Sequence, residues 1–225
     1  GDAVRGVSGK VDINNDSTIT ANGGSGVNVD GAKKVNISES VVSADKDGII
    51  AKNTGVLGVS ITNTEVTAGD DGINISDSLG VVRISDTKVV AGGDGINVSD
   101  NTVAGNEINN IDITAGGDGL VVKDTVNLTV NLTKKGSIDA DKGINASGTT
   151  TININSATGS SLDITAETAG MSITGGAKLN DNVETVIKTT ADDSNGIDVR
   201  DTGSNANFTK KLTIDALGSD SAGIR

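Results

Sequence analysis

The sequence predicts an all-β fold, a right-handed parallel β-helix with about nine coils and three short strands per coil, in one domain over residues 1–225. Three observations predict this fold. A glycine-led segment recurs every 22 to 27 residues. Each repeat holds three segments in which aliphatic and polar residues alternate, as they do in strands. Aromatic residues are almost absent, with Phe208 as the single one, which suits a narrow interior filled by small aliphatic side chains.

The first segment of each repeat reads glycine, aliphatic, any residue, aliphatic. Clear copies begin at Gly26, Gly72, Gly95, Gly119, Gly170 and Gly196, weaker ones at Gly48 and Gly143, and a truncated one at Gly223. Successive side chains of a strand point to opposite faces. We therefore expect the two aliphatic residues inside the coil and the residue between them outside.

The second and third segments follow in most repeats. The second segment covers residues 35–37, 59–61, 82–84, 126–128 and 152–154. The third segment ends in alanine and covers residues 19–21, 42–44, 66–68, 89–91, 113–115, 138–140, 164–166 and 214–216. The recurring alanine indicates a tight position just before the next corner.

Stacked coils explain these segments better than other repeat folds. No segment with helical spacing lies between the strands to serve as a crossover helix. In a stack, equivalent strands pair in parallel about 4.8 Å apart, and the usual hand of parallel connections favours a right-handed coil. A leucine-rich repeat would need a leucine consensus that is missing, and hexapeptide β-helices have a much shorter period.

An Asp-Gly pair follows the third segment in several repeats and has two interpretations. Aspartate and glycine are typical of a turn that needs a positive φ. Alternatively, a row of carboxylates, with Asp71, Asp94 and Asp118 as the candidate ligands, could bind calcium between coils, because hard cations take several oxygen ligands. The known calcium-binding repeat is much shorter than this one. The turn is therefore favoured, and no metal or other cofactor is predicted.

Composition excludes several classes of function. The chain has no His and no Cys, which removes zinc and haem sites, cysteine nucleophiles and Ser-His-Asp triads. A net charge of −12 argues against nucleic acid as a partner. Aliphatic runs are too short for direct membrane insertion. The acid pairs at 70–71 and 192–193 could serve a glycoside hydrolase, but aromatic sugar platforms are missing, so we predict no enzyme activity.

Two further features concern the outer surface. Asn74 and Asn97 follow the inward residue of neighbouring repeats, so we expect them to form an external amide ladder. Irregular stretches at 101–110, 179–185 and 201–211 predict loops, which carry binding more often than the scaffold does. From these loops the predicted partner-binding residues are Asn182, Glu184, Asn207, Phe208, Lys210 and Lys211.

The repeated Asp-Gly-Ile-Asn-Val units, the Gly, Asn, Thr and Ser bias and the lack of Cys and Pro resemble the passenger regions of bacterial autotransporters, which use type V secretion. This resemblance implies a β-helical fragment of a longer passenger that is secreted or displayed on the bacterial surface. It implies an adhesin or virulence factor that binds a host-cell receptor or a matrix component, or self-associates. The alternatives are a released ligand that activates a host receptor and, less favoured, a polysaccharide-degrading enzyme.

Overall fold

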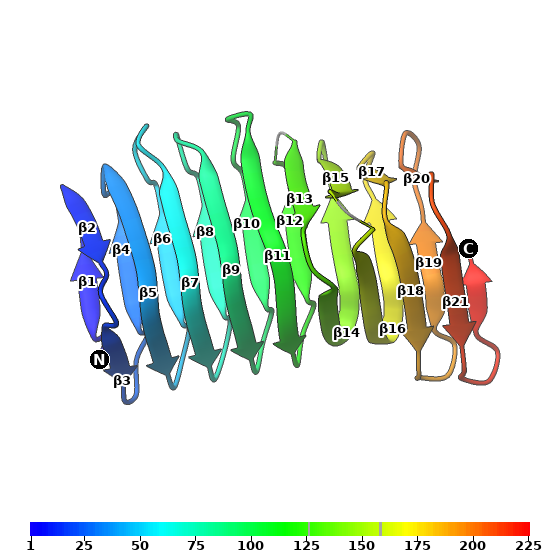
Figure 1. Ribbon diagram of the computed structural model, residues 1–225, viewed down its shortest axis with the longest axis horizontal. Helices are drawn as coiled ribbons and strands as arrows, with labels where there is room; N and C mark the ends of the chain where they lie inside the picture. Colours follow the sequence, from blue (N-terminus) through cyan, green and yellow to red (C-terminus); the bar gives the residue numbers. More distant parts are fainter. Residues whose placement is uncertain (126, 158) are drawn as a thin grey trace.

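The computed structural model describes residues 1–125, 127–157 and 159–225, and these form a rod of stacked coils (Figure 1). The described residues form strands and no helix, and every strand pairing between them is parallel. Figure 1 shows the two termini at opposite ends of the rod. The predicted parallel β-helix of about nine coils is therefore confirmed.

Three stacks of strands run along the rod, one for each segment of the repeat. The first stack contains β1 (Val4–Gly6), β4 (Val27–Asp30), β6 (Ile49–Lys52), β8 (Ile73–Ser76), β10 (Ile96–Ser99), β12 (Leu120–Lys123), the second halves of β14 (Gly136–Ser147) and β16 (Ser161–Thr174), β19 (Asn195–Val199) and β22 (Ala222–Ile224).

The second and third stacks share several strands. The second stack contains β2 (Lys10–Ile13), the first halves of β5 (Lys34–Ala44), β7 (Val59–Ala68), β9 (Val82–Ala91) and β11 (Asn106–Ala115), then β13 (Leu128–Leu132), β15 (Thr151–Ser156), β17 (Lys178–Asp181) and β20 (Asn205–Phe208). The third stack contains β3 (Thr18–Ala21), the second halves of β5, β7, β9 and β11, the first halves of β14 and β16, then β18 (Glu184–Thr189) and β21 (Leu212–Ala216).

We call the three kinds of connection between stacks the first, second and third links, in chain order within a coil. In β5, β7, β9 and β11 the second link is a bend inside one continuous strand. A residue with positive φ makes each bend, namely Glu39, Asn63, Asp86 and Asn110, with φ between 48° and 58°. Asparagine and aspartate tolerate this left-handed conformation better than most residues, which explains three of the four.

The first links also turn through the left-handed region. The residues are Asn53, Asp77, Asp100, Asp124 and Asp201, with φ from 45° to 72°, and Gly31, Gly148 and Gly175 take the position in three other coils. The residue after several of these turns points inward and is polar, as in Thr54, Ser78, Asn101, Thr125 and Thr150, all at most 1% exposed. Their hydroxyl and amide groups are satisfied inside the rod; Thr54 Oγ1, for example, donates to Ser78 Oγ at 2.6 Å.

The core is a continuous column of Val, Ile and Leu from all three stacks. Equivalent residues lie directly above one another, as Ile73, Ile96 and Leu120 do in the first stack. The alanines that end the third segments are paired in the same way, as Ala44 is with Ala68. The predicted inward positions of these segments are therefore confirmed.

Three details of the predicted segments are wrong. The second segment predicted at 126–128 should end at Leu128, but Leu128 pairs with Ile152 and begins β13; Val126 lies outside the described residues. Residues 101–110 are not one long link, because Asn106 begins β11 and takes the inward position opposite Leu128. A third segment at 187–189 was not predicted, because it ends in Thr189, which is fully buried and stands where the other third segments have alanine.

Asn106 can replace an aliphatic residue in the core because hydrogen bonds satisfy its amide. Its Oδ1 accepts from the Val82 N–H at 3.0 Å and from Asn101 Nδ2 at 3.2 Å, and its Nδ2 donates to the Val103 carbonyl at 2.8 Å. A buried polar group without such partners would destabilise the fold. Hydrophobic alternation alone could not have located this strand.

Ile96→Asp should destabilise the rod by more than about 3 kcal/mol, because Ile96 is 1% exposed and an unpaired carboxylate would lie among aliphatic side chains. The matched control is Thr67→Asp, at an exposed outward position, which should change the free energy of unfolding by less than about 0.5 kcal/mol. Chemical denaturation followed by circular dichroism measures both. Equal losses for the two variants would contradict the inward and outward assignment.

Candidate functional site

The Asp-Gly corners form a hydrogen-bonded ladder along the third links. Asp47 Oδ1 accepts from the Asp71 N–H at 3.2 Å, Asp71 Oδ1 from the Asp94 N–H at 2.9 Å, and Asp94 Oδ1 from the Asp118 N–H at 2.8 Å. Each carboxylate thus binds the backbone of the next coil, about 4.8 Å away along the rod. We call this row the aspartate ladder.

Asp118, the last carboxylate of the ladder, binds side chains instead of a backbone amide. Its Oδ1 lies 3.2 Å from Lys142 Nζ, and its Oδ2 accepts from Asn145 Nδ2 at 2.6 Å. Both partners belong to the following coil. The ladder therefore ends on a cation and an amide that neutralise and satisfy its last carboxylate.

The glycines of these corners are needed for close packing rather than for positive φ, so the reason predicted from the sequence is wrong. Gly48, Gly72, Gly95 and Gly119 do not have positive φ values. A Cβ on Gly72 would clash with Val89 Cγ1 and would lie 2.5 Å from the carbonyl oxygen of Gly95. The coils are simply too close at this column for any side chain.

The aspartate ladder was also the candidate for calcium binding. Among the described residues, no group of three or more acidic side chains lies close enough to hold a metal ion. Burial raises the pKa of Asp47 and of Asp94, while the hydrogen bond from the next coil acts in the opposite direction. Asp71, Asp94 and Asp118 each have a structural partner, which favours the turn interpretation.

The predicted amide ladder at Asn74 and Asn97 does not form. The two residues are paired in register on the outer face of the first stack, but Asn97 Oδ1 is buried without a hydrogen-bond partner among the described residues. Hydrogen-bonded asparagine pairs lie on the second stack and its links instead: Asn131 to Asn109 at 3.0 Å, Asn180 to Asn153 at 2.9 Å and Asn182 to Asn155 at 3.1 Å. Periodicity indicated that asparagine ladders exist but not which face carries them.

The stretch 179–185 is not a loop, contrary to the sequence prediction. Leu179 and Asp181 are buried in β17, and β18 begins at Glu184 after a short second link. In the stretch 201–211, residues 201–204 form a first link, and residues 205–208 form β20. The regular stacking of these strands explains the difference, since the longer coils retain all three stacks.

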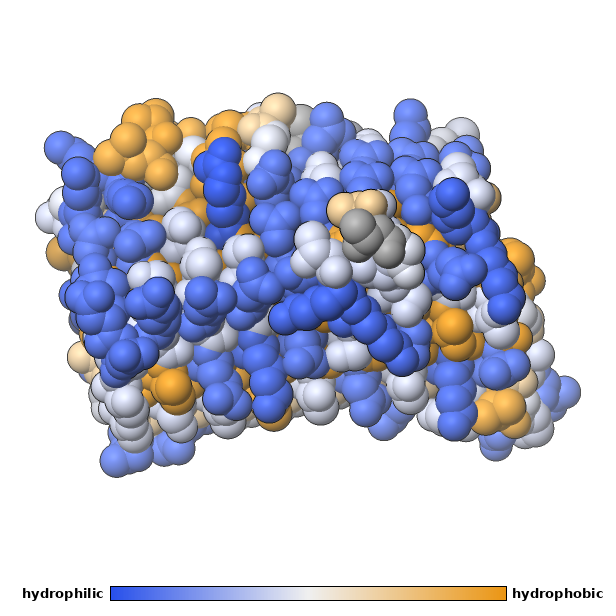
Figure 2. All heavy atoms as spheres, in the orientation of Figure 1, coloured by the Kyte–Doolittle hydropathy of each residue, from blue (hydrophilic) through white to orange (hydrophobic). Residues whose placement is uncertain are grey.

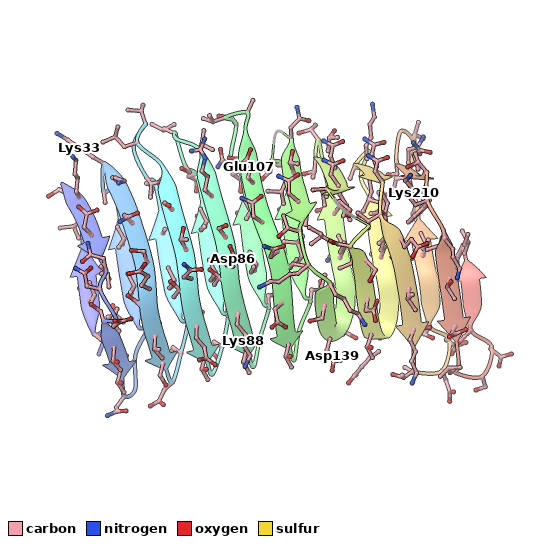
Figure 3. The ribbon with its side chains drawn as sticks, viewed as in Figure 1. Lys33, Asp86, Lys88, Glu107, Asp139 and Lys210 are labelled. Atoms are coloured by element: carbon pink, nitrogen blue, oxygen red, sulfur yellow. The ribbon has the colours of Figure 1, made fainter. Side chains whose placement is uncertain are left out.

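Three of the predicted partner-binding residues come together. Asn182, Glu184 and Lys210 line a surface hollow of about 280 Å³ with Ser156, Gly159, Ser160 and Val183. Asn182 is also held by Asn155 and by Thr209, whose Oγ1 donates to Asn182 Oδ1 at 2.7 Å. We call this feature the polar hollow. Lys210 lies toward the C-terminal end of the rod (Figure 3).

The other three predicted residues lie outside the polar hollow. Asn207 is exposed and stacks on Asn180. Lys211 is exposed, and its carbonyl accepts from the Thr185 N–H at 2.9 Å. Phe208 is half-buried, is paired with the inward residue Asp181 and packs against the core. The Phe208 ring therefore contributes to the core packing rather than to an exposed contact surface.

No match to a known protein was found. No family model, no curated protein and no solved structure matches this chain. Within the described residues, no helix is long and apolar enough to cross a membrane.

The core contains a carboxylate that was not predicted from the sequence. Asp181 is fully buried at an inward position between Ile154 and Phe208 in the second stack. Its Oδ2 accepts from Thr185 Oγ1 at 2.6 Å and its Oδ1 from the Val183 N–H at 2.9 Å. Burial raises the pKa of Asp181 despite these bonds. The alternation of inward and outward residues that starts at Leu179 would have predicted the inward position of Asp181.

The acid pair at 192–193 also has a structural explanation. Asp192 Oδ1 accepts from the Ser219 N–H at 2.9 Å, and the hydrogen bonds from the side chain and backbone of Ser219 lower the pKa of Asp192. Asp193 makes a left-handed turn with φ of 56°.

Gly72→Ala should destabilise the rod by about 2 kcal/mol or more, because its Cβ would press on the backbone and core of the neighbouring coil. Gly223 is the matched control, since it occupies the same column in the last coil and an added Cβ there meets no atom within 4 Å. Thermal unfolding of Gly72→Ala and Gly223→Ala measures the difference. Equal melting temperatures would show that close approach does not select glycine.

Asp181→Asn should stabilise the protein at neutral pH. Because burial raises the folded-state pKa of Asp181, its contribution to stability is complete below the ordinary aspartate pKa of about 3.9 and is lost as pH rises through the folded-state value. Asparagine keeps the acceptor for Val183 and carries no charge.

Melting temperatures measured at several pH values check this expectation. The gain from Asp181→Asn should be largest near neutral pH and should shrink toward pH about 4. Asp139→Asn, at an exposed position in the third stack, is the control and should show a smaller effect. A gain that does not vary with pH would contradict the buried-carboxylate explanation.

Proposed function

We propose that this chain is a non-enzymatic rod of the autotransporter passenger type, exported to the bacterial surface or secreted, which binds a host-cell receptor or a matrix component. One observation carries the proposal: at the third links of the described chain, the carboxylates of Asp71, Asp94 and Asp192 accept backbone amides of the neighbouring coil, so these candidates for chemistry hold the stack together. What remains for recognition is the outer surface of a rigid stack. Such a surface suits adhesion.

The polar hollow is the best candidate for the contact surface. Glu184 and Lys210 present opposite charges at its wall, and Asn182 and the serines add amide and hydroxyl groups. Hydrogen bonds to Asn155 and Thr209 hold the Asn182 amide in place, so binding a partner need not order that side chain. A polar partner that carries both charges, such as an exposed protein segment, fits this arrangement.

Charge reversal in the polar hollow tests the proposal. The variant Glu184→Lys with Lys210→Glu should bind cultured epithelial cells, or surfaces coated with collagen or laminin, at least about tenfold more weakly than the unchanged chain, a loss of about 1.4 kcal/mol. Quantitative binding of the fluorescently labelled chain measures this. The control is Glu107→Lys, because Glu107 lies nearer the middle of the rod, away from Lys210 (Figure 3).

Binding that is equal for all three chains would exclude the polar hollow as the contact. Absence of binding to any of these surfaces would contradict the adhesive function. Activation of a host-cell response by the free chain would instead support the released ligand. Turnover of an acidic polysaccharide would support the enzyme.

A further inference from the structure

The third link after β3 contains Asn22-Gly23, one of the two Asn-Gly pairs in the sequence. Both residues are exposed in a turn, and a Cβ placed on Gly23 would meet no atom within 4 Å beyond its chain neighbours. Figure 1 places this link at the lower edge of the rod beside the N-terminus, where Figure 2 shows hydrophilic residues at the surface. The turn is therefore accessible to water, and its backbone has room to change.

A carboxylate of the next coil contacts the backbone nitrogen of this pair. The Gly23 N–H donates to Asp45 Oδ2 at 2.6 Å. The backbone holds Asp45 in this place, because the Asp45 N–H donates to the Ala21 carbonyl and the Lys46 N–H donates to the Gly24 carbonyl, each at 3.1 Å. A carboxylate at hydrogen-bond distance can act as a general base toward the nitrogen that it contacts.

The second Asn-Gly pair, Asn195-Gly196, has the opposite surroundings. Asn195 is only 9% exposed and lies in β19. A Cβ on Gly196 would lie 2.5 Å from the Gly223 carbonyl oxygen, so the backbone of the last coil closes over this pair. The same dipeptide thus occurs once in an open turn beside a base and once in a packed strand.

The Asp-Gly pairs of the aspartate ladder also differ from Asn22-Gly23. The N–H groups of Gly48, Gly72 and Gly95 donate to backbone carbonyls of the next coil, which are much weaker bases than a carboxylate. A carboxylate also resists attack by a nucleophile more than the carboxamide of asparagine does. The open turn at Asn22 therefore combines a better electrophile with a better base.

We propose that Asn22 converts itself to aspartate or isoaspartate, with Asp45 as the general base. Asp45 takes the proton from the Gly23 nitrogen, which attacks Asn22 Cγ, and glycine has no side chain to shield this nitrogen. The new N–Cγ bond closes a cyclic succinimide. The Cγ–Nδ2 bond breaks, and the proton held by Asp45 leaves with Nδ2 as ammonia.

Water completes the reaction by opening the succinimide. Its hydroxyl adds to one of the two ring carbonyls, and its remaining proton returns to the Gly23 nitrogen. Opening at Cγ gives aspartate at position 22. Opening at the backbone carbonyl of residue 22 gives isoaspartate, in which the main chain runs through Cγ and is longer by one carbon.

Either product changes the contact between the first two coils. A neutral amide becomes a carboxylate beside Asp45, which adds one negative charge to the net charge of −12. Repulsion between the two carboxylates weakens the bond from the Gly23 N–H to Asp45, which ties this link to the next coil. The reaction does not depend on the proposed adhesive function, because the polar hollow lies in later coils.

Peptide mapping of the whole chain, aged in warm neutral buffer, tests the site. Each conversion raises the mass of a peptide by about one dalton, and isoaspartate is separated from aspartate by chromatography. In the folded chain Asn22 should convert at least about tenfold faster than Asn195, whereas in concentrated urea the two pairs should convert at similar rates. An unchanged Asn22, or equal rates at the two asparagines in the folded chain, would overturn the proposal.

The variant Asp45→Asn tests the base. Asparagine keeps an acceptor for the Gly23 N–H but takes no proton from it, so conversion of Asn22 should slow at least about tenfold. The matched control is Asp220→Asn, at an exposed position in the last third link, which should leave the rate unchanged. Circular dichroism checks that both variants are folded. An equal rate in Asp45→Asn and the unchanged chain would overturn the assignment of Asp45 as the base.

Discussion

The close approach of successive coils at the third links is the constraint on which the rest of the rod depends. At this column the backbone of one coil touches the next, so glycine is required at Gly48, Gly72, Gly95 and Gly119. Asp47, Asp71 and Asp94, which precede three of these glycines, then lie where their carboxylates accept the backbone amide of the following coil. With this column in register, the aliphatic side chains of the first stack lie directly over one another and the core is continuous. The core packing, the hydrogen bonds of the aspartate ladder and the row of carboxylates thus all repeat at the spacing between coils.

Sequence periodicity predicted most of this fold because a two-residue alternation and a constant repeat length leave few alternatives. It failed where a polar residue takes an inward position. Asn106 and Asp181 are buried in the core and are satisfied by bonds from residues close in the chain, which alternation of hydrophobicity does not report. The sequence prediction also assigned positive φ to the Asp-Gly corners of the third links, whose glycines do not have it. Aspartate and glycine occur at both the first and the third links, and only the structure distinguishes the left-handed φ at Asp77 from the close approach of two coils at Gly72.

The candidate site was predicted in part, for a related reason. Asn182 and Glu184 belong to one coil and Lys210 to the next, and the repeat alone indicated that they are near one another along the rod. The sequence predicted loops around these three residues, whereas they lie at strand ends and in short links. Phe208 was selected as the single aromatic residue, but rarity carries no information on direction, and its ring packs inward.

The three kinds of link differ in how much length they tolerate, and this sets where the chain can change. The third links after β5, β7, β9 and β11, which carry the aspartate ladder, all contain four residues, whereas the third links after β3, β18 and β21 contain five at the same glycine column. The first links have no such column and contain three residues before β5 but six before β7 and β11. Residues can be inserted on that edge without disturbing the core. New surface can therefore evolve along the edge formed by the first links, while the four third links of the aspartate ladder keep one length and hold their coils in register.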